Sequence, residues 1–361
     1  MKFWKRGILF LLVFAISVSM VGCKPKDETK VDEEITDAST EELQNKELEQ
    51  ESEESEIIIT DHLGRTVTLD KKAEKIVSGY YITTSMMIAL GLEDNVVGIE
   101  AKAKSRPIYS LAAPEFLELP NVGTAKEFNL EGTIALEPDL VILPIRLKDA
   151  VESLEKMGIK VLAVNPENMD LLKETLKIVG LATGTTERAD KLISYYDDKY
   201  IQIEKLIGTE SKKKVYLGSN SDFLSTAAKN MYQNYMIGAA GGINVASDID
   251  DTYWATISYE QLISYNPDII VIVPEADYTK DDIINDAKLA GINAVKNNKI
   301  YVMPDTFEAW DSPVPSSILG TMWLTFVINE DIHNFDDFKE EVANFYETFY
   351  NFTVDKEKIT K

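Results

Sequence analysis

Short apolar runs that alternate with helical segments constrain this chain more than any other feature. Such runs recur between residues 76 and 164, and the same alternation resumes after residue 214. Strands that alternate with helices are typical of βαβ units, in which neighbouring strands pair in parallel. The sequence therefore predicts the α/β class, with mostly parallel sheets. After a hairpin over 57–69, strands are predicted at 96–99, 140–143, 161–164, 269–273 and 300–303. Residues 76–81 and 215–220 are each predicted to be a strand that runs into a loop.

One long helical pattern separates the two sets of strands. Residues 187–207 contain no Gly or Pro, and Thr185 and Thr186 are candidate N-cap residues. The region from 57 to 361 is longer than one hydrophobic core usually organises. We therefore predict two α/β lobes and a linking helix, over residues 57–184, 209–361 and 185–208 respectively.

The two halves share a short sequence pattern. Glu131 precedes Pro138 by seven residues, and Glu260 precedes Pro267 by the same seven. Each proline is followed by an aspartate and then by an apolar run. A Pro-Asp turn before a strand is common, but the equal spacing favours an internal duplication of one α/β unit.

The N-terminal residues predict export. Three basic residues precede an apolar stretch over 7–20, which is short for a membrane-spanning helix and suits a signal peptide. The stretch ends just before Cys23, the only cysteine of the chain. This arrangement resembles a bacterial lipoprotein signal, which implies cleavage after residues 1–22 and acylation of the Cys23 sulfur. The alternative is an uncleaved anchor helix, and both place the rest of the chain outside the cytoplasm.

The segment after Cys23 is strongly acidic. Residues 24–56 hold fourteen acidic and four basic side chains and no aromatic ones. Such a composition does not bury enough apolar surface to offset its ordering entropy, so 23–56 is predicted to be a disordered tether. The net charge of -24 argues against nucleic acid and anionic lipid as partners. Contact with the cell membrane is expected through the lipid alone.

A series of short motifs runs in a fixed order along the chain. The motifs are DHLGRTV (61–67), ALGL (89–92), NLE (129–131), PDLVI (138–142), AGGINVA (240–246), SYEQL (258–262) and PDII (267–270). In this order they resemble the class III substrate-binding proteins of ABC importers, which bind iron-siderophore complexes, haem and cobalamin. The resemblance implies two parallel-sheet βαβ lobes joined by one long spine helix, with a ligand cleft that closes only slightly. It also implies a monomer whose partners are ABC permease and ATPase subunits.

Two carboxylates match positions that serve docking in this family. The resemblance implies that Glu131 and Glu260, one on each lobe, meet arginine residues of the permease. Two carboxylates set far apart suit a pair of basic pockets, which gives orientation and specificity.

The candidate ligand residues lie in loops that follow the predicted strands, because ligands of open α/β sheets sit beyond the carboxyl ends of the strands. Arg106 and Arg146 are candidates to clamp an anionic group, although each is equally suited to a surface ion pair. Trp254 and Trp310 are candidates to stack on a flat ligand. The full set is Tyr80, Tyr81, Arg106, Arg146, Asn220, Tyr253, Trp254 and Trp310.

The expected ligand is an iron-siderophore or a related metal chelate, with no cofactor. A corrinoid, haem, or a molybdate- or tungstate-like oxyanion is the alternative. Residues 308–320 resemble a branch of the family that includes molybdate- and tungstate-binding members as well as presumed iron-chelate binders. His62 and His333 are the only histidines, which argues against a His-rich zinc or manganese site.

The sequence offers no enzyme chemistry. It has no cysteine after residue 23, no Gly-x-Ser-x-Gly and no glycine-rich phosphate loop that opens a helix. A surface adhesin is the other class of function, but tandem repeats or an all-β pattern would be more usual for it.

Overall fold

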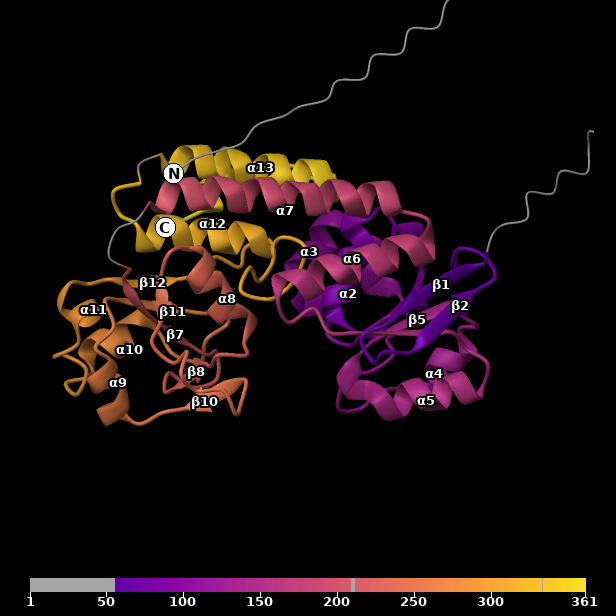
Figure 1. The fold of residues 1–361 in the computed structure, drawn as a ribbon, viewed down its shortest axis with the longest axis horizontal. Helices are drawn as coiled ribbons and strands as arrows, with labels where there is room; N and C mark the ends of the chain where they lie inside the picture. Colours follow the sequence, from indigo (N-terminus) through magenta and orange to yellow (C-terminus); the bar gives the residue numbers. More distant parts are fainter. Residues whose placement is uncertain (1–55, 209–211, 333) are drawn as a thin grey trace, which may run out of the picture. The chain divides into compact units, whose positions relative to one another are not determined.

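Two sheets built mainly from parallel strands organise the computed structural model, which describes residues 56–208, 212–332 and 334–361 (Figure 1). The predicted signal peptide, Cys23 and the tether up to residue 55 lie outside the described residues, as does His333. None of the helices in the described part of the chain is long and apolar enough to cross a membrane.

The N-terminal sheet has four strands, and every neighbouring pair is parallel. In pairing order they are β4 (Val96–Ile99), β3 (Ile76–Ser78), β5 (Leu140–Pro144) and β6 (Val161–Val164). The helices of this half are α2 (Tyr81–Ala89), α3 (Pro107–Ala112), α4 (Leu130–Ala135), α5 (Lys148–Lys156) and α6 (Met169–Thr183).

Helices cover both faces of this sheet, which explains why its strands read as unbroken apolar runs. Successive side chains of a strand point to opposite faces. Accordingly, Leu140 and Ile142 of β5 join the core formed with α2 and α6. Val141 and Leu143 pack instead with residues of α5.

The C-terminal sheet repeats this arrangement. Its parallel part pairs β9 (Ile243–Asn244), β7 (Lys214–Gly218), β11 (Ile269–Ile272) and β12 (Ile300–Val302) in that order. Two antiparallel strands extend the sheet beyond β7, namely β8 (Ser225–Ala227) and β10 (Trp254–Thr256). The helices of this half are α8 (Tyr232–Ala239), α9 (Tyr259–Tyr265), α10 (Lys280–Asn285) and α11 (Asn293–Lys296).

The Pro-Asp pattern makes the same contacts in both halves. The Asp139 carboxylate accepts a hydrogen bond from the Lys75 amide at 3.0 Å, and its own amide donates to the Lys75 carbonyl at 2.8 Å. Asp268 bonds to the backbone of Lys214 in the same two ways, at 3.0 and 2.9 Å. Each aspartate thereby fixes the start of the strand next to its own. This repeated geometry agrees with the predicted internal duplication.

The predicted hairpin is formed by β1 (Ile57–Thr60) and β2 (Thr66–Leu69), which pair antiparallel. Asp61 attaches it to the N-terminal sheet, because its buried carboxylate accepts a hydrogen bond from the Ala163 amide of β6 at 3.0 Å.

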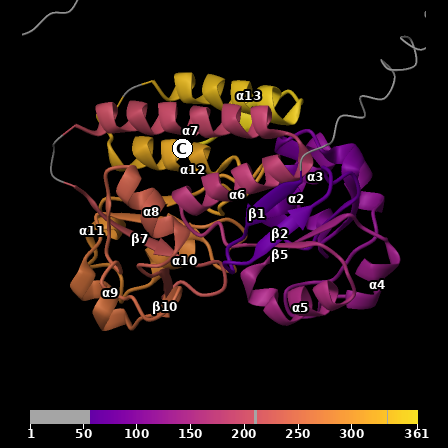
Figure 2. The ribbon, with the colours of Figure 1, turned by 45° about the vertical axis from the view of Figure 1, so that its right-hand side comes forward.

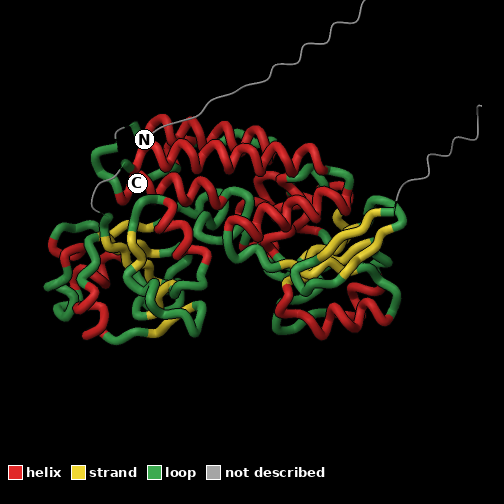
Figure 3. Tube along the Cα trace, viewed as in Figure 1, coloured by secondary structure: helices red, strands yellow, loops and turns green. Residues whose placement is uncertain are grey.

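The predicted linking helix is observed as α7 (Thr186–Ile207). Two further helices, α12 (Ser317–Ile328) and α13 (Phe335–Tyr350), lie with it along one side of both sheets (Figure 1), and the three stay stacked when the view is turned (Figure 2). Figure 3 shows the strands confined to the regions on the other side of this helical layer. α13 packs against α2 of the N-terminal half, so the segment 209–361 does not belong to the C-terminal lobe alone.

Glu308 joins segments that are far apart in the sequence. Its buried carboxylate accepts hydrogen bonds from the hydroxyl groups of Ser85 in α2, Ser316 before α12 and Tyr350 at the end of α13. Burial raises the pKa of this carboxyl, and the hydrogen bonds from Ser316 and Ser85 oppose that rise.

Arg188, in the first half of α7, makes a second connection. Its Nε donates to the Ala89 carbonyl at the end of α2 at 2.6 Å, and its Nη2 donates to the Phe349 carbonyl of α13 at 2.9 Å. The last carbonyl groups of a helix have no partner within the helix, so a cation there satisfies them and opposes the helix dipole.

Replacing Arg188 by Ala is expected to lower the free energy of unfolding by roughly 2–3 kcal/mol, because both carbonyl groups lose a charged donor. Chemical denaturation measures this change. Lys205→Ala, at an exposed position of the same helix, is the control and is expected to stay within about 0.5 kcal/mol of the parent chain. If Arg188→Ala lowers the free energy of unfolding no more than Lys205→Ala does, the two hydrogen bonds of Arg188 do not stabilise the packing of α7 with α2 and α13.

Candidate ligand cleft

A cavity of about 730 Å³ lies between residues of the two halves. Its lining comes largely from the loops at the carboxyl ends of the parallel strands, where ligands of such sheets bind. Those loops follow β3, β5 and β6 in the N-terminal half and β7 and β11 in the C-terminal half. The loop before α12 and the first turn of α8 complete the walls.

Most of the predicted ligand residues line this cavity. They are Tyr80, Tyr81, Arg106, Arg146, Asn220, Tyr253 and Trp254. The structure therefore gathers side chains from five separate segments around one space, as expected for the ends of strands. Their contact with a ligand stays a prediction.

Trp310 is the exception, and its placement in the cleft was wrong. It is only 1% exposed and packs edge-to-face against Phe338 of α13. Its Nε1 donates a hydrogen bond to the Tyr346 hydroxyl at 2.8 Å. Because its ring is packed in the core and its Nε1 already has an acceptor there, Trp310 does not line the cavity.

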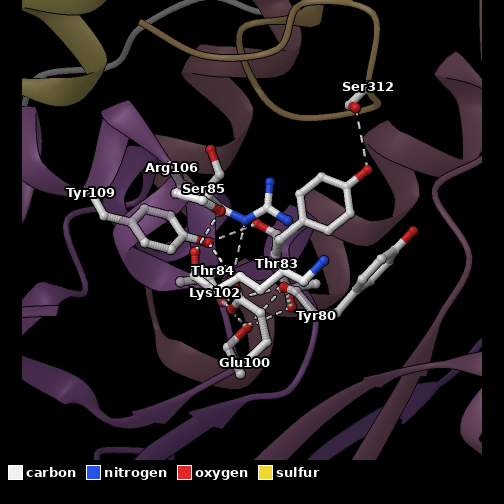
Figure 4. A network of polar contacts seen from close by, with 12 residues as sticks. Tyr80, Thr83, Thr84, Ser85, Glu100, Lys102, Arg106, Tyr109 and Ser312 are labelled. Atoms are coloured by element: carbon white, nitrogen blue, oxygen red, sulfur yellow. Dashed lines mark hydrogen bonds and ion pairs between the residues drawn. The ribbon is translucent and has the colours of Figure 1, made fainter. Parts of the chain in front are cut away.

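Arg106 is held at the N-terminal wall by two neighbouring side chains (Figure 4). Its guanidinium carbon lies 4.0 Å from the centroid of the Tyr81 ring, and its Nε lies 3.4 Å from Glu100 Oε1. Among the described residues, neither terminal nitrogen of Arg106 has a hydrogen-bond partner. The planar fork is thus positioned for bidentate contact with an anionic group.

Glu100 is fixed in turn by the residues around it. It is 6% exposed, and its carboxylate accepts hydrogen bonds from the hydroxyls of Thr84 at 2.5 Å and Tyr109 at 2.7 Å (Figure 4). Burial raises the pKa of the Glu100 carboxyl, while the hydrogen bonds and Arg106 act in the opposite direction. This buried group orients Arg106 without itself lining the cavity.

Arg146 sits on the same wall, in an exposed position directly after β5. Its guanidinium carbon lies 5.2 Å from the centroid of the Tyr80 ring. Glu167 follows β6 nearby, and burial raises the pKa of its carboxyl while Arg146 lowers it. Each arginine of this wall therefore lies over one of the two adjacent tyrosines.

The opposite wall, from the C-terminal half, carries acids and an amide. Gln233 and Asp311 are 4% and 8% exposed, and Gln233 Nε2 donates to the Asp311 carboxylate at 3.2 Å. Burial raises the pKa of Asp311 to about 6. Glu275 lies at the rim after β11, with a φ of 56° that is uncommon for a residue with a side chain.

Two aromatic residues at the start of β10 line the cavity from the same half, namely Trp254 and the residue before it, Tyr253. Tyr253 is 52% exposed and Trp254 36% exposed, which is unusual for such large apolar groups. Across the cleft, the Tyr81 hydroxyl donates to Ser312 Oγ at 3.2 Å and connects the two walls (Figure 4).

Sequence reasoning missed several lining residues. Glu167 and Glu275 follow buried strands, so the rule that identified Arg146 was sufficient to find them. Gln233 gave no such signal, because it lies in a helix and reaches the cavity only through tertiary packing.

The two predicted docking residues occupy equivalent positions. Glu131 and Glu260 are exposed in the first turns of α4 and α9. Each helix has a side-chain N-cap, since Asn129 accepts from the Gly132 amide and Ser258 from the Gln261 amide. A backbone hydrogen bond and one from Ser258 hold the pKa of Glu260 below its usual value.

Two α/β halves with a ligand-sized cavity between them define a solute-binding protein. Residues 76–306 match the family described as periplasmic binding protein, and the chain belongs to that family. Its members are solute-binding components of ABC transporters and are not enzymes. The predicted family, fold class and absence of enzymatic function are thereby confirmed.

Similar proteins extend over most of the chain. The molybdate-binding protein MolA of Haemophilus influenzae is 24% identical over 318 residues, covering 81% of this chain and 90% of MolA. The uncharacterized ABC transporter substrate-binding lipoprotein YvrC of Bacillus subtilis is 28% identical over 313 residues, covering 83% and 91%. A periplasmic solute binding protein from Veillonella parvula has a similar structure, with a TM-score of 0.73, 25% identity and coverage of 83% and 94%.

The Asp311 carboxyl is expected to make stability fall as pH rises. Its folded pKa of about 6 exceeds the ordinary 3.8, so the folded state holds this proton more tightly than the unfolded state does. The neutral form is therefore favoured on folding, and that advantage is lost between about pH 4 and pH 6. Asp311→Asn is expected to raise the free energy of unfolding by roughly 1–3 kcal/mol at neutral pH and to have little effect at about pH 4.

Denaturation of the parent chain and the variant at a series of pH values measures this difference. Taking the difference removes the contribution of other titrating groups. A gain that is the same at both ends of the pH range would contradict the buried, proton-retaining state of Asp311.

Proposed function

We propose that this solute-binding protein captures an anionic metal chelate, such as an iron-siderophore complex, in the cleft and delivers it to an ABC importer. The observation that carries the proposal is the combination of cavity size with two arginines on one wall. A volume of about 730 Å³ falls within the range of sites for organic ligands. The arginines would meet the anionic oxygens of the chelate.

The aromatic lining supports an organic ligand over a bare ion. Tyr80, Tyr81, Tyr253 and Trp254 line the cavity from both halves. Such surfaces favour contact with the apolar or conjugated parts of a ligand. A single tetrahedral oxyanion would leave most of them in contact with water.

Molybdate is the second candidate ligand, because MolA resembles this chain over most of its length. Paired guanidinium groups recognise oxyanions as well as carboxylates. A corrinoid or haem is a further alternative within the same role. Anchoring through Cys23 at the outer side of the cell membrane is part of the proposal.

Thermal melting of the full-length chain, purified in mild detergent, tests the ligand. The panel contains ferric siderophores, their iron-free forms, haem, cobalamin, molybdate and tungstate. A bound ligand at a hundredfold its dissociation constant adds about 2.7 kcal/mol of stability. We expect a shift with at least one ferric chelate and none with its iron-free form. A shift with molybdate or tungstate alone would replace the chelate by an oxyanion, and no shift with any compound would contradict this set of ligands.

Arg146→Met is expected to weaken the affinity for the bound ligand at least about tenfold, which corresponds to about 1.4 kcal/mol. Lys148→Met, two residues further on and exposed, is the matched control. Equal affinity of the two variants would exclude Arg146 from the site.

Docking on the permease is proposed to use Glu131 and Glu260. We expect Glu131→Ala combined with Glu260→Ala to reduce ligand uptake at least about tenfold in cells that carry the transporter, because each lobe loses a charged contact. Ligand affinity is expected to stay unchanged, since neither residue lines the cavity. Glu152→Ala, at another exposed position, is the control. Normal uptake by the double variant would show that docking relies on other residues.

A further inference from the structure

The two walls of the cavity differ in charge at equivalent positions. Arg146 lies eight residues after Pro138, and Glu275 lies eight residues after Pro267. Both prolines begin the Pro-Asp turns that make the same contacts in the two halves. The duplicated unit therefore places an arginine on one side of the cleft and a glutamate on the other.

Glu275 is one of several acceptors on the C-terminal wall. Asp311 and Gln233 lie there as well, both more than nine-tenths buried and both lining the cavity. Gln233 Nε2 is used by Asp311, whereas Gln233 Oε1 is buried without a hydrogen-bond partner. Buried amide oxygens ordinarily accept a hydrogen bond, so Gln233 Oε1 has the capacity to accept one more donor.

In the part of the chain that the structure describes, no lysine or arginine pairs with these acceptors. Within the described residues, neither Asp311 nor Glu275 forms an ion pair, and no Lys or Arg of the C-terminal half lines the cavity. Burial opposes the ionisation of Asp311. The wall thus combines a carboxylate that has no cationic partner with an amide oxygen that has no donor, and a positively charged donor would satisfy both.

We propose that Gln233, Asp311 and Glu275 form a subsite for a protonated amine of the ligand. Resting on the proposed function, this assigns the ligand to chelates that carry anionic oxygens at one end and an ammonium group at the other. The oxygens face Arg106 and Arg146, and the ammonium faces the acceptors of the opposite wall. A bare oxyanion has only acceptor atoms and leaves this subsite unsatisfied.

The test uses butylammonium chloride as the probe and tetramethylammonium chloride at the same concentration as its control. Tetramethylammonium has the same charge but no N–H donor. Thermal melting of the full-length chain in mild detergent is followed with each salt at about 50 mM, a concentration chosen for a weakly binding fragment. We expect butylammonium to raise the Tm by about 2 °C relative to tetramethylammonium.

Variants locate the effect. Asp311→Asn is expected to abolish the shift although it stabilises the chain at neutral pH, so a general loss of folding is not the cause. Gln233→Leu is expected to reduce the shift by removing Oε1. Glu152→Gln, a carboxylate replaced far along the surface of α5, is expected to retain it in full.

The subsite would be overturned by no shift with butylammonium, by an equal shift with tetramethylammonium, or by a full shift in Asp311→Asn. Loss of the shift in Glu167→Gln, with Asp311→Asn unaffected, would place the cation on the opposite wall and also overturn it. The probe contains no metal, so this result is independent of the chelate panel. If butylammonium shifts the Tm and no ferric chelate does, the ammonium subsite is kept and the ferric chelate is rejected. If a ferric chelate shifts the Tm and butylammonium does not, the chelate is kept and the subsite is rejected.

Discussion

The buried carboxylate of Glu308 holds together the parts of the chain that shape the cleft. It accepts hydrogen bonds from three hydroxyl groups, which belong to α2, to the segment before α12 and to the end of α13. A buried charge is tolerable only when its acceptor sites are filled in this way. Since α2 begins at Tyr81 and the loop after Glu308 carries Asp311 and Ser312, one buried group fixes elements of both walls.

Short segments of the sequence are sufficient to predict much of this architecture. A parallel strand buried on both faces must be a continuous apolar run, so the runs at 140–143 and 269–273 identified β5 and β11 directly. The side chains that follow such strands must meet at one edge of the sheet. That rule predicts that Tyr80, Arg146 and Asn220 lie close together, and all three line one cavity.

Other features depend on contacts between distant residues and have no local signal. Trp310 follows a strand as a ligand residue would, but its ring is covered by Phe338 and its Nε1 is used by Tyr346. Gln233 and Glu308 likewise acquire their roles from partners far along the chain, at Asp311 and Ser85. Only the folded chain decides whether such a side chain is covered or left facing a cavity.

The predicted internal duplication would account for one binding site with two dissimilar walls. In each half the aspartate of the Pro-Asp turn bonds to the start of the neighbouring strand, while the side chains at the strand ends differ. A ligand with opposite charges at its two ends would contact both halves at once, whereas a purely anionic ligand would contact one. A ligand shifts the equilibrium between two arrangements of the lobes only to the extent that its binding free energy differs between those arrangements. Under the proposed assignment, a ligand that contacts both walls therefore favours a single arrangement of the two halves. That arrangement would set a fixed distance between Glu131 and Glu260, the two residues proposed to dock on the permease.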